Sequence, residues 1–159
     1  MQELNDSAID NPIQAARDEI ENKLNDGLEL LSFGGHGSYG SWGFQGVVNT
    51  DFVKSLSNQG KPAVVMPLAC YTSNYEHPSV NTLAHQWLFA GDFGAAAIHG
   101  ASVLGEYREN AVFSERYLNN SANSKTIGEA IYKAKNEMAS GNQMLHNWAY
   151  LGDPTLPLR

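Results

Sequence analysis

The chain has 159 residues, a length that suits one globular domain with its own core. Apolar residues make up 42% and charged residues 17%, which excludes the disordered class of low hydrophobicity and high charge. The net charge of −7 argues against nucleic acid or an anionic membrane as the main partner, and the single cysteine excludes an internal disulfide and a multi-cysteine metal site. No apolar run approaches the roughly 18 residues that cross a bilayer, and the acidic start MQELNDSAID does not have the pattern of a signal peptide.

The first half of the chain predicts two helix–strand pairs. A helix is expected to begin at Pro12, which suits a first helical position, and to end at Gly27, which suits a C-terminal cap. An apolar run of strand length, residues 28–33, follows at once. After a glycine-rich stretch, a helix near residues 50–57 leads into a second strand at residues 63–68.

The second half predicts one more strand among helices. The small-residue run at 94–102 suits a central buried strand, and the tail from Leu151 is expected to lie extended along the domain because two prolines break it. Helices are expected near residues 79–90, 110–118 and 127–138. The resulting order α-β-α-β-α-β-α-α predicts an α/β fold, a parallel sheet flanked by helices. Three strands make a small sheet for this architecture, so we expect the C-terminal part of a larger domain.

Two residues suited to nucleophilic catalysis follow the first two predicted strands. His36 comes just after the first strand and Cys70 just after the second. If these strands are parallel neighbours, both residues emerge at the edge where open α/β sheets carry out chemistry. A cysteine nucleophile needs a base such as imidazole, and backbone N–H donors such as those of Gly37 and Cys70 to hold the oxyanion. The pair predicts a cysteine hydrolase site, although either residue alone would more often be a buried thiol or a loop histidine.

Four strings, in this order, resemble motifs of the gingipain-like cysteine peptidases. LSFGGHGSYGSWG at 31–43 resembles the histidine motif of that family, and VVMPLACYTSNY at 64–75 resembles its nucleophile motif. GAAAIHGAS at 94–102 resembles the strand after the nucleophile helix. TIGEAIYKAKNEM, leading to YLGDPTLPL, resembles the end of the catalytic domain. The similarity covers nearly the whole chain.

The resemblance implies the caspase–haemoglobinase fold, a three-layer sandwich, and a His36–Cys70 dyad that hydrolyses peptide bonds. Gly37 and Cys70 would supply the oxyanion hole. Tyr107 stands about where the family carries an aromatic residue over the specificity pocket. Trp42 and Glu76 are the remaining candidates for substrate binding, with core packing and a solvated loop as their alternative roles.

The resemblance also sets expectations for the rest of the protein. The family's catalytic domain begins before the helix at Pro12, so residues 1–159 are expected to form one subdomain that lacks the usual N-terminal strands. An N-terminal subdomain or a second chain would then complete the sheet. The substrate is expected to be a protein or peptide, at the surface of a bacterium or outside it. No cofactor is expected for catalysis, and structural calcium is the one metal that the resemblance allows.

The remaining histidines do not predict a metal site. They are His77, His85, His99 and His146, and they are scattered, whereas zinc ligands usually cluster on one helix or hairpin. His99 lies within the predicted strand of small residues, so we expect it to be buried and hydrogen-bonded.

Two other functions are alternatives to the peptidase. The chain could be a non-catalytic interaction module or inactive fragment that keeps the fold, because the early strands are missing. It could also be a CHAT-type or caspase-like signalling protease, which likewise uses a catalytic histidine and cysteine. The Gly-His-Gly-Ser run and the Gly-Asp-Pro ending favour the gingipain-like peptidase.

Overall fold

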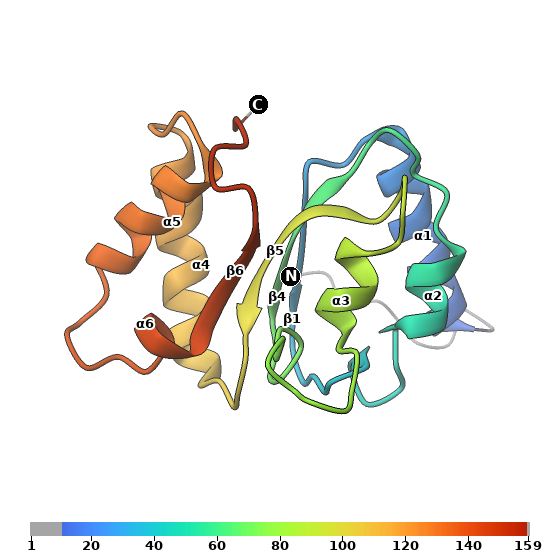
Figure 1. The fold of residues 1–159 in the computed structure, drawn as a ribbon, viewed down its shortest axis with the longest axis horizontal. Coiled ribbons are helices and arrows are strands. Elements are labelled where there is room, and N and C mark those ends of the chain that lie inside the picture. The colour runs from blue at the N-terminus through green and yellow to red at the C-terminus, as the bar shows by residue number, and fades with distance from the viewer. Residues whose placement is uncertain (1–10, 159) are drawn as a thin grey trace.

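A mixed four-stranded sheet forms the centre of the structure, a computed structural model that describes residues 11–158 (Figure 1). The strand order is β1-β4-β5-β6, with β1 at Leu30–Gly34, β4 at Ala63–Leu68, β5 at Ala95–Ala101 and β6 at Trp148–Gly152. β1, β4 and β5 run parallel, and β6 pairs antiparallel with β5. The three predicted strands are confirmed. β6 is an additional edge strand, and the expectation about MQELNDSAID lies outside the described residues.

Helices cover both faces of this sheet, as the three-layer prediction requires (Figure 1). One face carries α1 (Pro12–Asp26), α2 (Thr50–Ser55) and α3 (Leu83–Leu88), and the other carries α4 (Tyr107–Ser121), α5 (Ile127–Asn136) and α6 (Met144–Asn147). Two apolar clusters, one on each face, form the core. β4 and β5 are buried along most of their length because both faces are covered.

Local signals explain where α1 begins and ends. The Asn11 side chain accepts a hydrogen bond from the Gln14 N–H, and Pro12 occupies the first turn. Gly27 ends the helix in the left-handed conformation at φ 97°, and its N–H bonds back to the last turn. The predicted helix from Pro12 to the Gly27 cap is therefore confirmed.

Tertiary contacts make α3 shorter than the predicted helix over 79–90. The N–H of Leu83 donates to the Tyr39 carbonyl, and the N–H of Ala84 donates to the Thr72 carbonyl. These bonds tie the first turn of α3 to the loops after β1 and β4, so the helix begins only at Leu83. The first turn of α3 is thereby held next to the loops that carry His36 and Cys70.

The glycine-rich stretch contains a small hairpin, which the sequence did not predict. β2 (Ser41–Trp42) pairs antiparallel with β3 (Val48–Asn49). Trp42 anchors this hairpin in the core, where its ring stacks on Phe33 at 5.2 Å and on Trp87 at 6.0 Å between centroids. The buried Trp42 ring therefore anchors the C-terminal end of the His36 loop to the hydrophobic core.

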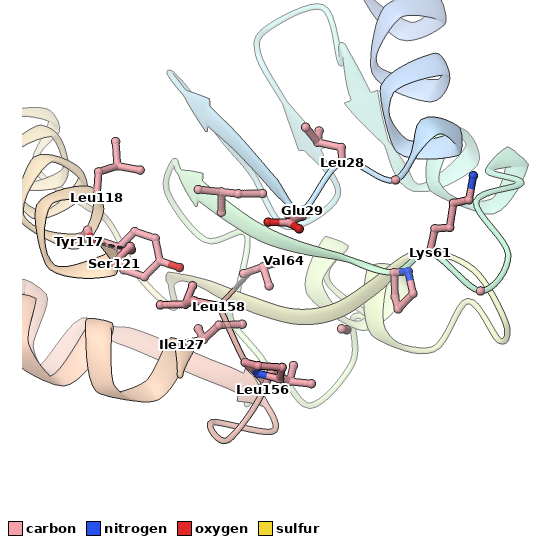
Figure 2. Close-up of a pocket in the computed structure, with 16 residues that line it drawn as sticks. Leu28, Glu29, Lys61, Val64, Tyr117, Leu118, Ser121, Ile127, Leu156 and Leu158 are labelled. Atoms are coloured by element: carbon pink, nitrogen blue, oxygen red, sulfur yellow. Dashed lines mark hydrogen bonds between the residues drawn. The ribbon is translucent and has the colours of Figure 1, made fainter. Parts of the chain in front are cut away.

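A pocket of about 420 Å³ lies at the opposite end of the sheet from the two candidate residues. Figure 2 shows that side chains from α4, α5, the C-terminal tail and the starts of β1 and β4 surround it. Its apolar lining includes Leu28, Leu30, Val64, Leu118, Ile127, Leu156 and Leu158. The outer edge of β1 beside this pocket has no partner strand within residues 11–158. No helix among those residues has both the length and the apolar character to cross a membrane.

Candidate active site

β1 and β4 bring His36 and Cys70 to the same edge of the sheet. The two strands are parallel neighbours, and their last paired residues are Gly34 and Leu68. His36 and Cys70 each lie two positions beyond that pair, and the Gly35 N–H still donates to the Leu68 carbonyl at 3.4 Å. The predicted common edge is confirmed.

Gly37 lies directly against the turn that carries Cys70. A Cβ atom built on Gly37 would stand 2.7 Å from the Ala69 Cβ and 2.8 Å from the Cys70 carbonyl oxygen. Real Cβ atoms essentially never make such short contacts with backbone atoms. Only glycine therefore allows the backbone after His36 to approach the Cys70 peptide this closely.

Hydrogen bonds hold the His36 loop against the β2–β3 hairpin. The Gly43 N–H donates to the His36 carbonyl at 2.8 Å, and the Ser38 N–H donates to the Ser41 carbonyl at 2.9 Å. The His36 side chain itself is exposed. Its ring contacts the ring of Phe44, with centroids 4.4 Å apart and planes tilted by 36°. The backbone of His36 is thus fixed while its ring faces solvent beside one aromatic neighbour.

The thiol of Cys70 contacts the loop that follows β5. The Gly105 N–H donates to the Cys70 sulfur at 3.4 Å, and the thiol reaches the Gly105 carbonyl at 3.7 Å. Cys70 is half-buried, so its sulfur is positioned by backbone groups without being sealed in the core. Gly105 was not singled out from the sequence, because only the folding of β5 beside β4 brings it to the cysteine.

The residue after Cys70 adopts a backbone conformation that is rare for its type. Tyr71 has φ 59°, in the left-handed region where bulky residues are uncommon. Its N–H donates to the Val103 carbonyl at 3.1 Å, and the Ser73 N–H donates to the Ala101 carbonyl at 3.0 Å. These bonds hold a sharp turn that costs on the order of 1–3 kcal/mol. They fasten the Cys70 turn to the end of β5.

Of the three candidates for substrate binding, two are exposed at the surface and one is buried in the core. Tyr107 begins α4, two residues after Gly105, and is 74% exposed. Glu76 is exposed in the loop after Cys70. Trp42 is only 1% exposed, so its assignment as a substrate contact is wrong: its ring is enclosed by Phe33 and Trp87 in the core.

His99 is buried as predicted, but the predicted hydrogen bonds are wrong. Neither ring nitrogen has a hydrogen-bond partner among the described residues. Aromatic rings surround the imidazole, with Phe113 and Trp148 each 5.1 Å away between centroids. Burial, and secondarily the charge of Lys135, lowers the pKa of His99 from 6.5 to about 3. His99 is therefore a neutral core residue at neutral pH.

Acid should destabilise the fold through His99. In the unfolded chain His99 takes up a proton as the pH falls below 6.5, whereas in the folded chain it stays neutral down to about pH 3. The free energy of unfolding therefore falls as the pH falls from 6.5 to about 3. The loss from this residue approaches about 1.4 kcal/mol per pH unit. Urea unfolding between pH 7 and pH 4.5 should show a shallower pH dependence in His99→Leu than in the wild type. Equal slopes would contradict this role.

The described residues do not fit a calcium or other metal site built from side chains. Within residues 11–158, no three His, Cys, Asp or Glu side chains come together in a way that could hold a metal ion. Hard cations such as calcium are bound mainly by carboxylate and carbonyl oxygens.

Known proteins share both the sequence pattern and the fold. Gingipain R2 of Porphyromonas gingivalis is 24% identical over an alignment of 155 residues, and the match covers 88% of this chain and 21% of that protein. The complex of Porphyromonas gingivalis RgpB pro- and mature domains superposes with a TM-score of 0.80 at 21% identity, covering 90% of this chain and 37% of that one. The Arg specific cysteine proteinase gingipain R superposes with a TM-score of 0.73 at 23% identity, covering 90% and 36%. The chain thus spans about a fifth of the length of gingipain R2 and just over a third of these two solved chains.

The match extends along almost all of the sequence at the level of the family. The model of peptidase family C25 matches residues 2–159, which include the histidine loop, the cysteine turn and the Gly-Asp-Pro tail. The resemblance to gingipain-like cysteine peptidases and the predicted fold are confirmed. The chain belongs to peptidase family C25.

Proposed function

We propose that this chain is the catalytic part of a cysteine endopeptidase that uses a His36–Cys70 dyad. The observation that carries the proposal is that His36, Gly37 and Cys70 all lie at one edge of the sheet. His36 and Cys70 follow adjacent parallel strands, and the Gly37 backbone lies against the Cys70 peptide. Membership of a peptidase family supports the reaction class.

The proposed reaction has two steps. The Cys70 thiolate attacks a peptide carbonyl carbon, and the N–H groups of Gly37 and Cys70 donate hydrogen bonds to the developing oxyanion. Protonated His36 gives its proton to the leaving amine, which departs and leaves a thioester on Cys70. His36 then accepts a proton from a water molecule that attacks the thioester, which releases the acid and restores the Cys70 thiolate beside protonated His36. Tyr107 and Glu76 remain proposed substrate contacts beside this site.

The rest of the protein is proposed from its relatives. Proteins or peptides are the proposed substrates, and the surface of a bacterium or the space outside it is the proposed location, because the relatives are gingipains of Porphyromonas gingivalis. An N-terminal subdomain is the proposed partner. The edge of β1 that has no partner strand within residues 11–158, and the apolar pocket beside it, would supply this subdomain with hydrogen-bonding groups and apolar surface.

The reactivity of the thiol tests the dyad against a non-catalytic module with the same fold. In the full-length protein, Cys70 should react with iodoacetamide at pH 6–7 at least about tenfold faster than a small-molecule thiol, because the imidazole of His36 promotes the thiolate. His36→Ala should remove this advantage. His146→Ala, which changes an exposed histidine on α6, should not.

Alkylation rates across the pH range, with the modified residue identified by mass spectrometry, provide the measurement. If Cys70 reacts no faster than the small-molecule thiol and His36→Ala changes nothing, the dyad is wrong and the non-catalytic module is favoured. The family match to C25 already favours the gingipain-like peptidase over a CHAT-type or caspase-like signalling protease.

A further inference from the structure

Phe44 is an exposed aromatic residue at the rim of the candidate active site. Its side chain is 88% exposed, and its ring contacts the imidazole of His36 at 4.4 Å between centroids. A single exposed apolar residue is ordinary on a protein surface. The contact with the proposed acid of the reaction sets Phe44 apart, because it places an exposed apolar ring directly beside the imidazole.

The loop around Phe44 is held in place from several directions. Gly43 and Gly46 adopt left-handed conformations at φ 73° and 65°, and the Gly46 N–H donates to the Gly43 carbonyl at 3.1 Å, which closes a tight turn. Arg17 of α1 donates to the Val47 carbonyl at 3.0 Å and to the Gly46 carbonyl at 2.9 Å. These hydrogen bonds hold the turn that carries Phe44 in one position.

The strand order determines how a peptide would cross the site. His36 follows β1, Cys70 follows β4 and Gly105 comes after β5, so the three residues are arranged in that order along the sheet edge. A carbonyl placed at the Cys70 sulfur therefore has the β5–α4 loop on one side and the His36 loop on the other. Since His36 protonates the leaving amine, the part of the peptide after the scissile bond must lie on the His36 side.

The two halves of a bound peptide would therefore contact different loops on opposite sides of Cys70. The acyl half faces the loop after β5, where Leu104 and Tyr107 are 65% and 74% exposed. The leaving half faces the β2–β3 turn, where Phe44 projects beside His36. An uncharged aromatic ring favours an apolar partner, because their contact removes apolar surface from water.

We propose that Phe44 contacts the side chain of the residue immediately after the scissile bond, and that the full-length protein prefers an apolar residue there. The inference rests on the proposed peptidase function. Phe44 determines specificity in this scheme, and the thiol and imidazole chemistry does not require it.

A pair of peptides that differ at one position tests the proposal. Both carry the sequence of a peptide that the full-length protein cleaves, with leucine or glycine after the scissile bond. Wild-type protein should cleave the leucine peptide with a kcat/KM about tenfold higher, a difference typical of an apolar contact. Phe44→Ala should bring this ratio close to one by lowering kcat/KM for the leucine peptide only, and Phe44→Tyr should retain most of it.

Phe89→Ala is the matched control. Phe89 is also an exposed aromatic residue, 79% exposed, and its ring stacks on a histidine, His85 of α3, at 6.0 Å. Its substitution should leave the leucine-to-glycine ratio unchanged. A role of Phe44 that only orients the imidazole would lower kcat/KM for both peptides equally.

The possible results separate the failure of this inference from the failure of the proposed function. A wild-type ratio near one, an unchanged ratio in Phe44→Ala, or an equal loss for both peptides overturns the Phe44 assignment while peptide hydrolysis stands. If the wild type cleaves no peptide, or cleaves as well with Cys70→Ala, the proposed function fails and the Phe44 assignment fails with it.

Discussion

Gly37→Ala is expected to lower kcat/KM for peptide hydrolysis by roughly 100- to 1,000-fold, the loss typical of an oxyanion-hole donor. The added Cβ would lie 2.7 Å from the Ala69 Cβ and 2.8 Å from the Cys70 carbonyl oxygen. Because these neighbours are backbone or attached directly to it, the backbone itself must move. That movement displaces the Gly37 N–H from the oxyanion and shifts His36, the adjacent residue.

Gly34→Ala is the matched control for this substitution. Gly34 ends β1 three residues earlier, and a Cβ atom there would meet no heavy atom of the described residues within 4 Å. The control should therefore keep its activity. Steady-state kinetics of both variants in the full-length protein, with urea unfolding to confirm that each is folded, provide the measurement. A Gly37→Ala variant that is folded and active within about threefold of the wild type would contradict the proposed oxyanion hole.

The sequence predicted the sheet edge well because its signals are local. The apolar runs before His36 and Cys70 have strand length, and each ends at small residues that break the strand. The Pro12 and Gly27 positions mark the ends of α1 through their own backbone preferences. Parallel pairing of β1 with β4 then requires the two reactive residues to leave the sheet on the same side.

Features that depend on distant contacts were not predicted. β6 is a short edge strand whose pairing with β5 joins residues about 50 positions apart, such as Ala101 and Trp148. Trp42 resembles a loop residue in the sequence, but Phe33 and Trp87 from other elements enclose it. No local pattern reports such contacts, because they form only when the layers pack.

Phe44 and Gly105, which lie beside the candidate site, could not be predicted from the sequence for the same reason. Phe44 is one aromatic residue in a glycine-rich stretch, and only the β2–β3 hairpin places it on the His36 ring. Its position between two glycines of a tight turn was the one available signal. Gly105 gave no signal at all, since its contact with the Cys70 sulfur spans 35 positions of the chain.

The Cys70→Ala variant of the full-length protein has the largest expected effect on activity. Removing the nucleophile of a cysteine or serine peptidase leaves only binding and oxyanion stabilisation, so kcat/KM should fall by at least about 10,000-fold. Stability should change little by comparison, because Cys70 is half-buried and the substitution removes one small sulfur atom. The loss would therefore be one of chemistry and not of folding.

Detection of a thioester on Cys70 tests most directly whether this residue is the nucleophile. The wild type and Cys70→Ala are mixed with a cleavable peptide, quenched with acid, and weighed by intact-mass spectrometry alongside the kinetic assay. We expect an adduct of the acyl half on Cys70 in the wild type, and neither adduct nor turnover in Cys70→Ala. A Cys70→Ala protein that hydrolyses the peptide at the wild-type rate would show that Cys70 is not the nucleophile.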